Sequence, residues 1–450
     1  MRFKPGRRLL TVASFCLTAV VVVASTSTPA AAMAVPSIEA ELETPTLFDD
    51  AAGGDANADD PAIWVHPTNS SKSLVLATAK EGGLRVYNLS GGLVQSIAAP
   101  AAPGPDDSPG RFNNVDLLYG VRVGGATVDL AVTTDRGRDK LRIHRINPAG
   151  GSTPLTDVTS ASAPLVFAAN AGEVNDQRTA YGLATWKDRA TGRNYALVSQ
   201  RHETTVTLLE LTATPTGTVT YHKVRSLTLP ASFALPNGST WTPCDDPGDL
   251  PQVEGMVVDA TSGVLYAGQE DVGIWKVSAT LTGTPVLMDK VKEFGLPLAY
   301  DPVTEECIQA GPDPGYGGTH ITADVEGLTI YYRANGKGYL LASSQGDNTF
   351  VVYQRSGANA FVGSFRIGPD SDPDDPDGSE ECDGAMVMNV PLGDRFDKGL
   401  FVVQDGFDTP EVLDGGGEPR TSTNFKFVEW DDIADDLDLA VDPTGWGPRR

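Results

Sequence analysis

A repeat of short apolar runs is the feature that most constrains the fold of this 450-residue chain. Each of six runs reaches a polar residue six positions after its first residue, and these end residues are Lys80, Arg136, Arg201, Glu270, Gln345 and Asp405. A second marker lies 16 to 22 residues upstream of each end residue, and these markers are Asp60, Asp116, Tyr181, Glu254, Glu326 and Asp383. This separation is the length of two short strands and a connection.

Antiparallel pairing of the two strands would place both markers of a unit at the same end of that unit. Repetition of a multi-stranded unit is typical of a propeller, whose blades are arranged radially around a channel. The 48 glycines and 32 prolines also favour short strands and turns over helices. We therefore predict an all-β, six-bladed β-propeller with polar residues around one mouth of its channel.

The sequence also predicts the structural roles of the segments outside the six repeats. Residues 38–48 are predicted to complete the last blade and so to remove an exposed strand edge. Residues 229–252 and 296–320 lack the apolar periodicity of a core, which predicts loop insertions within one large domain. The acidic tail from Asp431 is expected to be frayed.

The first 34 residues have the composition of a secretory signal peptide. Four basic residues precede a short apolar stretch, which is followed at once by Ser, Thr and Pro and then by small residues. The shortness of the apolar stretch favours export over a membrane anchor. We expect a secreted, monomeric domain of residues 35–450 without a membrane partner. Removal of residues 1–34, which carry four basic and no acidic residues, changes the net charge from −25 to −29 and disfavours nucleic acid as a partner.

Three cysteines remain after residue 34. Cys244 and Cys307 lie in loop segments rich in Pro, Gly and Asp, and such loops are often joined by disulfides in oxidising compartments. Spacing alone leaves three pairings open, of which we select Cys244–Cys307, with Cys382 free.

The two marker series divide the predicted mouth by charge. The end residues of the first three units are cationic, and those of the last three are acidic or amide. A single such residue is usually a solvated charge at a strand end, but a six-fold recurrence with segregated sign argues against that reading. Crowded carboxylates without His or thiolate ligands favour Ca²⁺, because it accepts six to eight oxygens in flexible geometry. Cations facing bound calcium indicate a substrate rich in phosphate.

Motifs of other phosphatase and phosphate-binding chemistries are absent from the sequence. The chain has no Cys-x5-Arg loop, no G-x4-G-K-[ST] loop and no G-x-S-x-G elbow. Arg201 and His202 lack the Gly that a histidine acid phosphatase motif requires at position 203. Metal-activated water is therefore the expected nucleophile.

Several long motifs resemble those of the β-propeller phytases, which are calcium-dependent enzymes that remove phosphate from inositol hexakisphosphate. The motifs include ADDPAIWVHP, NNVDLLY, AYGLATW and DVEGLTIYYRANGKGYLLASSQGDN, and the resemblance extends from about residue 36 to residue 434. It implies phosphate binding by Lys80, Arg136, Tyr181 and Arg201. It implies binding of calcium or its bridging waters by Asp59, Asp60, Glu254, Glu270, Asp324, Glu326, Gln345, Asp377, Asp383 and Asp405.

Two positions depart from the family pattern. Arg201 and His202 replace the usual Lys-Glu pair, and Phe407 and Asp408 replace an acidic or amide pair after Asp405. The first change retains a cation and loses a carboxylate, and the second is expected to weaken one calcium site.

The expected function is that of a secreted calcium-dependent phytase with catalytic residues Lys80, Arg136, Tyr181, Arg201, Glu254 and Glu270. Two other functions suit the same architecture. One is a non-enzymatic, calcium-stabilised propeller that binds an extracellular ligand, and the other is a calcium-dependent lactonase. The three cationic strand ends favour a phosphate ester, because a lactone needs no triple cation.

Overall fold

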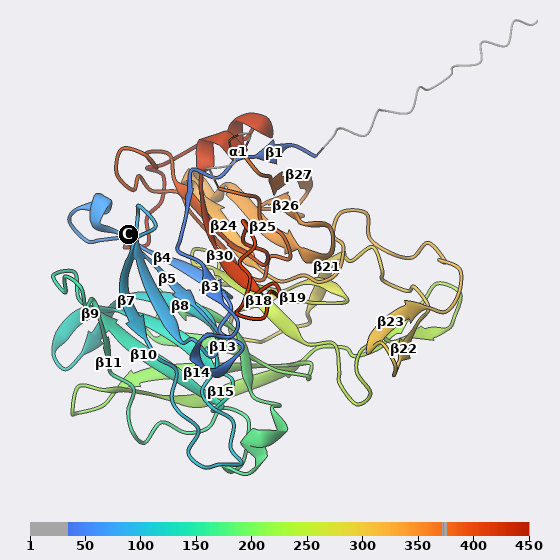
Figure 1. The fold of residues 1–450 in the computed structure, drawn as a ribbon, viewed down its shortest axis with the longest axis horizontal. Helices are drawn as coiled ribbons and strands as arrows, with labels where there is room; N and C mark the ends of the chain where they lie inside the picture. The colour runs from blue at the N-terminus through green and yellow to red at the C-terminus, as the bar shows by residue number, and fades with distance from the viewer. Residues whose placement is uncertain (1–34, 371, 373–375, 450) are drawn as a thin grey trace, which may run out of the picture. The chain divides into compact units, whose positions relative to one another are not determined.

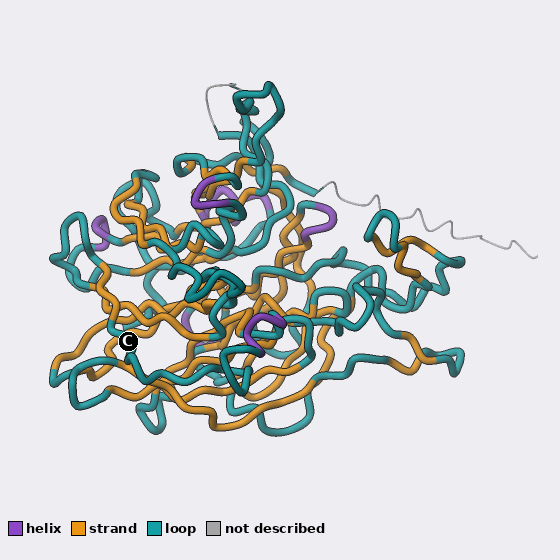
Figure 2. Tube along the Cα trace, turned by 60° about the horizontal axis from the view of Figure 1, so that its bottom comes forward, coloured by secondary structure: helices purple, strands orange, loops and turns teal. Residues whose placement is uncertain are grey.

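The computed structural model describes residues 35–370, 372 and 376–449, so the predicted signal peptide lies outside the described residues. The unit from Val35 onward is built almost entirely of strands, with one short α-helix, α1 (Trp430–Asp436) (Figures 1 and 2). Its strands form six antiparallel blades arranged as a propeller, which confirms the predicted fold. Inner strands of neighbouring blades contact one another around the complete ring.

The first three blades each contain four strands in chain order. Blade one consists of β4 (Pro61–Trp64), β5 (Leu74–Thr78), β6 (Leu84–Asn88) and β7 (Leu93–Ile97). Blade two consists of β8 (Phe112–Val123), β9 (Ala126–Asp135), β10 (Lys140–Ile146) and β11 (Leu155–Asp157). Blade three consists of β12 (Ala180–Lys187), β13 (Asn194–Gln200), β14 (Thr205–Ala213) and β15 (Val219–Thr228).

The last three blades follow the same plan, with additions from the N-terminus. Blade four consists of β18 (Val253–Asp259), β19 (Val264–Gln269), β20 (Gly273–Ser278) and β21 (Val286–Lys290). Blade five consists of β24 (Leu328–Tyr332), β25 (Gly338–Ser344), β26 (Thr349–Gln354), β27 (Phe361–Ile367) and the added β1 (Ser37–Ile38). Blade six consists of β28 (Ala385–Met388), β29 (Leu400–Asp405), β30 (Ser422–Glu429) and the added β2 (Leu42–Glu43) and β3 (Leu47–Phe48).

The N-terminal segment joins two blades. Strands β2 and β3 pair antiparallel with β30, and β1 pairs parallel with β27. The same segment therefore covers edges of both blade six and blade five, which protects exposed backbone groups.

Burial explains the composition of the repeated runs. Strands such as β5 and β25 are buried along almost their whole length, because neighbouring blades cover both faces. A strand of this kind carries a continuous apolar run rather than an alternating one. Short 3₁₀ turns lie between the strands, namely η1 (Ala51–Gly53), η2 (Ser70–Lys72), η3 (Glu173–Asp176), η4 (Ala334–Gly336) and η5 (Gln345–Asp347).

The two predicted insertions each contain a small hairpin. One consists of β16 (Phe233–Ala234) and β17 (Thr240–Trp241), and the other of β22 (Leu298–Asp301) and β23 (Glu306–Gln309). A disulfide joins Cys244 to Cys307 and Cys382 is free, as predicted, and Cys382 is also buried. No helix among the described residues is long and apolar enough to cross a membrane.

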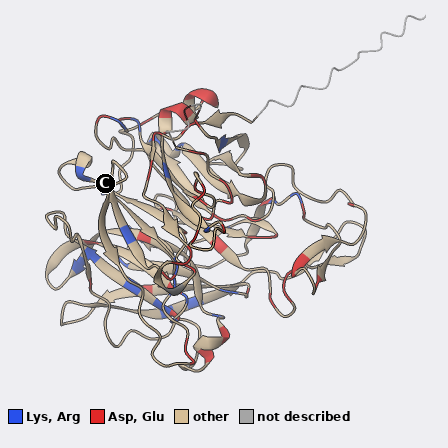
Figure 3. Cartoon of the chain, viewed as in Figure 1, with Lys and Arg blue, Asp and Glu red and all other residues tan. Residues whose placement is uncertain are grey.

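The C-terminal tail is not frayed, so that expectation is wrong. Residues 431–436 belong to the acidic helix α1, which begins at Trp430 (Figure 3). Farther along, the Trp446 ring stacks on Tyr332 with 3.9 Å between centroids. Arg449 forms an ion pair with Asp129 of β9 and donates to the carbonyl of Val65. Aromatic stacking and a partly buried ion pair therefore attach the tail to blades one, two and five.

Candidate active site

Equivalent backbone hydrogen bonds define the register of the inner strands. Three blades share a bond of 2.8–3.0 Å from the second strand to the first, namely Thr78 N to Asp60 O, Ser343 N to Gly327 O and Gln404 N to Gly384 O. Asp59, Glu326 and Asp383 directly precede these acceptors, so they occupy equivalent positions in their blades. The equivalent residues of all six blades form a ring, which consists of Asp59, Asn113, Tyr181, Glu254, Glu326 and Asp383.

Close approach of the blades brings neighbouring ring residues together. A Cβ at Gly182 would collide with the backbone of Glu254, and a Cβ at Gly255 would collide with the backbone of Glu326. Glycine therefore permits an inter-blade distance that other residues would prevent.

Three of the predicted markers are out of register with this ring. Asp60 lies one residue beyond the ring, and its carboxylate accepts from Val115 N at 2.9 Å. Asp116 lies three residues beyond Asn113 and accepts from Thr185 N and Oγ1 at 2.7 and 2.9 Å. Gly406, which lies two residues after Gln404, occupies the position of Lys80 and Gln345, so Asp405 is displaced by one residue. Asp60, Asp116 and Asp405 therefore do not occupy equivalent positions in the ring, contrary to the expectation from the sequence.

Glu254, Glu270 and Glu326 form an acidic triad at the mouth. One carboxylate oxygen from each lies within 4.8 Å of the other two, and all three residues are buried. Tyr181 donates its hydroxyl to Glu254, and Asn113 Nδ2 donates to the same carboxylate at 2.6 Å. Burial raises the pKa of Glu270 and Glu326 well above the ordinary value, and the charge of Glu254 raises both further.

The acidic triad has the properties of a site for a hard cation. Glu270 Oε1 and Glu326 Oε2 are buried and have no hydrogen-bond partner in the described part of the chain. Unpaired buried oxygens are costly, and a divalent cation would both pair them and remove their mutual repulsion. The oxygen-only donor set suits Ca²⁺. The residues present therefore fit the group that the family resemblance implies.

Lys80 connects two further carboxylates at the mouth. Its Nζ lies 3.1 Å from Asp383 Oδ2, and Gln345 Nε2 donates to Asp383 Oδ1 at 3.0 Å. Burial lowers the pKa of Lys80, but the carboxylates of Asp383 and Asp59 outweigh that effect and raise the pKa above its ordinary value. Asp59 is itself buried, and its Oδ2 has no hydrogen-bond partner in the described residues. Lys80 is therefore a fixed cation.

Arg136 and Arg201 form the cationic part of the mouth together with Tyr181. The Arg136 guanidinium lies 5.6 Å from the centre of the Tyr181 ring and donates to Asn113 Oδ1 at 3.1 Å. Burial lowers the pKa of Arg201, and the nearby charge of Arg136 lowers it further. Two guanidinium groups whose charges act on each other would be stabilised by a bound anion.

Asp324 lies beside the acidic triad and interacts with Asp271. Burial raises the pKa of Asp324 to about 6, and the charges of Asp245 and Glu254 contribute. Burial and the charge of Asp324 likewise raise the pKa of Asp271 well above its ordinary value. A further pair of carboxylates therefore extends the acidic side of the mouth.

Asp377 and Asp405 belong to a second cluster rather than to the triad. Both form ion pairs with the fully buried ammonium of Lys426 in β30, and Asp405 Oδ2 lies 3.3 Å from Nζ. Glu43 and Asp408 complete this group, with distances of 2.6 and 3.8 Å to Nζ. Oxygens of Glu43, Asp377 and Asp408 also lie within 4.8 Å of one another.

Some residues of the site were not predicted. Asn113 replaces a carboxylate of the ring, and the doubled Asn of NNVDLLY was the available signal. Asp271 directly follows Glu270, so it could have been identified from position alone. Lys426 lies between Phe425 and Phe427, and a charged residue within an apolar strand was a usable signal for a buried ion pair.

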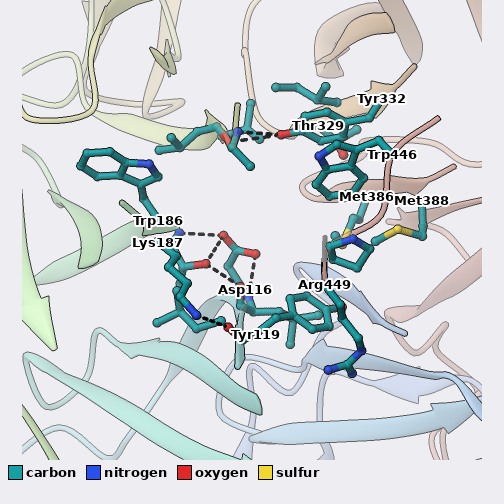
Figure 4. A pocket seen from close by; sticks show the side chains of 18 of the residues that line it. Asp116, Tyr119, Trp186, Lys187, Thr329, Tyr332, Met386, Met388, Trp446 and Arg449 are labelled. Carbon is teal, nitrogen blue, oxygen red and sulfur yellow. Dashed lines mark hydrogen bonds between the residues drawn. The ribbon is translucent and has the colours of Figure 1, made fainter. Parts of the chain in front are cut away.

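A cavity of about 530 Å³ lies among different residues from the triad. Trp446, Tyr332 and Thr329 lie on one side of it and Trp186 and Asp116 on the other, as Figure 4 shows. Of the predicted markers only Asp116 lines it. This cavity is thus separate from the acidic triad.

Comparisons with known proteins identify a relative of clear sequence similarity and two more distant solved structures. A 3-phytase of Bacillus subtilis (strain 168) is 34% identical over 394 residues, which cover 87% of this chain and 84% of that protein. Among solved structures, the calcium-binding protein regucalcin from Agrobacterium tumefaciens is 10% identical, with coverages of 88% and 96% and a TM-score of 0.43. A putative 6-phosphogluconolactonase from Bacteroides fragilis is 15% identical, with coverages of 65% and 68% and a TM-score of 0.34. The family model described as Phytase matches residues 7–235 and 313–445, and the chain therefore belongs to the phytase family.

Proposed function

We propose that this protein is a secreted, calcium-dependent phytase that hydrolyses inositol hexakisphosphate to lower inositol phosphates and inorganic phosphate. The observation that carries the proposal is the acidic triad of Glu254, Glu270 and Glu326 beside the cations Arg136 and Arg201. Family membership and the 3-phytase relative support the substrate class.

The residues at the mouth divide the work of phosphate ester hydrolysis. Arg136, Arg201 and Lys80 would bind phosphate oxygens and offset the negative charge that develops during transfer. Tyr181 and Asn113 hold the carboxylate of Glu254 in one orientation through their hydrogen bonds. A preorganised site of this kind avoids reorganisation when charge develops.

The acidic side would hold calcium. Glu254, Glu270 and Glu326 are the central ligands, and Asp59, Asp324, Gln345 and Asp383 are further ligands or partners of bound water. Bound calcium would supply positive charge and increase the acidity of coordinated water. It would also reduce repulsion between a chain whose net charge without residues 1–34 is −29 and a polyanionic substrate.

The second cluster is proposed as a stabilising calcium site made by Glu43, Asp377 and Asp408, with Asp405 nearby. Its buried lysine already neutralises part of the carboxylate charge. Secretion is supported by the composition of residues 1–34 and by the Cys244–Cys307 disulfide.

The test is phosphate release from inositol hexakisphosphate by the purified protein with calcium and with EDTA. We expect release only with calcium. A binding propeller would release none under either condition, and a lactonase would open lactone substrates without releasing phosphate. Either result would refute the proposed function.

A further inference from the structure

A histidine–aspartate pair lies next to Arg201 and has no role in the function proposed above. His202 Nδ1 lies 2.7 Å from Asp249 Oδ2, while Asp249 Oδ1 accepts from Arg178 at 3.0 Å. The His202 backbone has a φ of 57° in the turn after β13, and its carbonyl accepts from Arg178 at 2.9 Å. Asp249 therefore holds the imidazole, and Arg178 holds both Asp249 and the turn that carries His202.

The turn is also connected to the acidic triad. Gln252 Oε1 accepts from the His202 backbone N at 2.8 Å, and Gln252 Nε2 donates to Glu270 Oε2 at 3.0 Å. Asp249 and Gln252 lie between β15 and β18, in the segment 229–252 that the sequence predicts to be a loop insertion. This connection therefore uses residues from a loop outside the blades.

The free edge of the imidazole is available to a ligand. Nε2 forms no hydrogen bond within the described residues, and the His202 side chain is 21% exposed. The charged groups that act on the ring are Arg201, Arg178, Arg136 and Asp249. A polar atom held beside guanidinium groups that bind phosphate is well placed to contact the same anion.

We propose that His202, held by Asp249, is a further phosphate-binding residue of this site, with Nε2 donating to a substrate phosphate that Arg136 and Arg201 also contact. This inference rests on the proposed function. It assigns His202 and Asp249 a role in affinity for highly phosphorylated substrates rather than in bond cleavage.

The charge of the ring should depend on the substrate. In the free protein, burial lowers the pKa of His202 to about 4, and the charges of Arg201, Arg178 and Arg136 contribute while Asp249 opposes them. A bound polyanion offsets these cations and raises the pKa, so the imidazole takes up a proton on binding. The extra affinity is then largest at low pH and is lost as pH rises through the pKa of the complex.

Inhibition by inositol hexasulfate tests the inference, because its sulfate groups do not titrate between about pH 5 and pH 8. The inhibition constant is measured with His202→Asn and wild type, using hydrolysis of inositol hexakisphosphate with calcium. Asn is chosen because it tolerates a positive φ. We expect the variant to bind the probe about tenfold more weakly at about pH 5.5, with a smaller difference at about pH 8 and little change in kcat.

Two further variants control the experiment. His222→Asn removes an exposed histidine of β15 that lies 3.7 Å from Glu210, and it should bind the probe as wild type does at both pH values. Asp249→Asn keeps an acceptor for Nδ1 but removes the charge, so it should reduce the affinity at low pH by a smaller factor. This variant carries the test if His202→Asn does not fold.

The outcomes separate the two proposals. The role of His202 alone would be overturned if the wild type releases phosphate while both variants bind the probe as wild type does. It would also be overturned if both variants bind the probe more weakly by the same factor at both pH values. A wild type that releases no phosphate would instead refute the proposed function. A loss of kcat without a change in the inhibition constant would assign His202 to chemistry and would also overturn the binding role.

Discussion

Removal of calcium should destabilise this protein more at about pH 8 than at about pH 5.5. The cause is the burial of Glu270 and Glu326 close to Glu254, which raises the pKa of both groups. A group whose pKa is higher in the folded state than in the unfolded state stabilises the fold below its unfolded pKa. That stability is lost as pH rises through the folded pKa, unless a cation neutralises the charge.

The size of the effect follows from Asp324, whose pKa rises from 3.8 to about 6. At about 1.4 kcal/mol per pKa unit, complete ionisation of this one carboxylate costs about 3 kcal/mol, of which about 1 kcal/mol is lost between about pH 5.5 and about pH 8. An unfolding entropy of about 2 cal/mol/K per residue gives a unit of this length a decrease in Tm of about 1 °C for that part of the cost. The carboxylates of the acidic triad add to this value, so a decrease of several degrees is expected.

The assay is thermal unfolding in EDTA and in excess calcium at the two pH values. In EDTA the Tm should fall as pH rises, and calcium should remove most of the decrease. Glu326→Gln removes one buried charge and should therefore raise the Tm in EDTA at about pH 8. Glu306→Gln, on the exposed strand β23, serves as the matched control and should have no effect. A Tm that does not fall with pH in EDTA, or a Glu326→Gln variant that melts below wild type there, would refute the reasoning.

Three other variants test separate parts of the molecule. Arg136→Ala should lower kcat/KM by a factor of roughly 10²–10³ without changing the Tm. The exposed control Arg225→Ala should keep full activity. Equal activity of the two variants would show that Arg136 is not part of the site. Glu254→Gln should remain folded in calcium but hydrolyse inositol hexakisphosphate poorly, because an uncharged ligand binds and orients the cation less well. Normal turnover per folded molecule would exclude Glu254 from the catalytic centre. Arg449→Ala should lower the free energy of unfolding by roughly 1–3 kcal/mol, because Asp129 loses its ion pair, and should leave the activity unchanged. An unchanged denaturant midpoint would show that the tail does not stabilise the blades.

The repeat in the sequence was sufficient to predict the fold and most of the mouth. A continuous apolar run that ends in a polar residue reports a strand buried on both faces, and six such runs fixed the number of blades. The disulfide could be selected because Cys244 and Cys307 both lie in loop segments. Lys80, Arg136, Arg201, Glu270 and Gln345 all follow strands at equivalent positions, as the spacing indicated.

The register of the inner strands could not be read in the same way. Bulges interrupt the pairing of β8, β12 and β18 at the ring residues, so a count of residues does not preserve the direction of the side chains. Asp116 was therefore assigned to the mouth although Asn113 lies there. Two side-chain pairs, Lys426 with Asp377 and His202 with Asp249, join residues that lie about 50 positions apart in the sequence. Insertions and long loops separate these residues, so local periodicity could not predict their pairing.

Hydrogen bonds across the mouth link its cationic and acidic sides. Asn113 bonds both Arg136 and Glu254, and Lys80 pairs with Asp383. A cation bound by Asp383 would compete with Lys80 for the same carboxylate and would leave the ammonium free for a phosphate. Coupling between two binding equilibria is reciprocal, so calcium should raise the affinity for a phosphate ligand by the same factor by which that ligand raises the affinity for calcium. The two halves of the mouth are therefore one thermodynamic unit, and a substitution on either side should alter binding on the other.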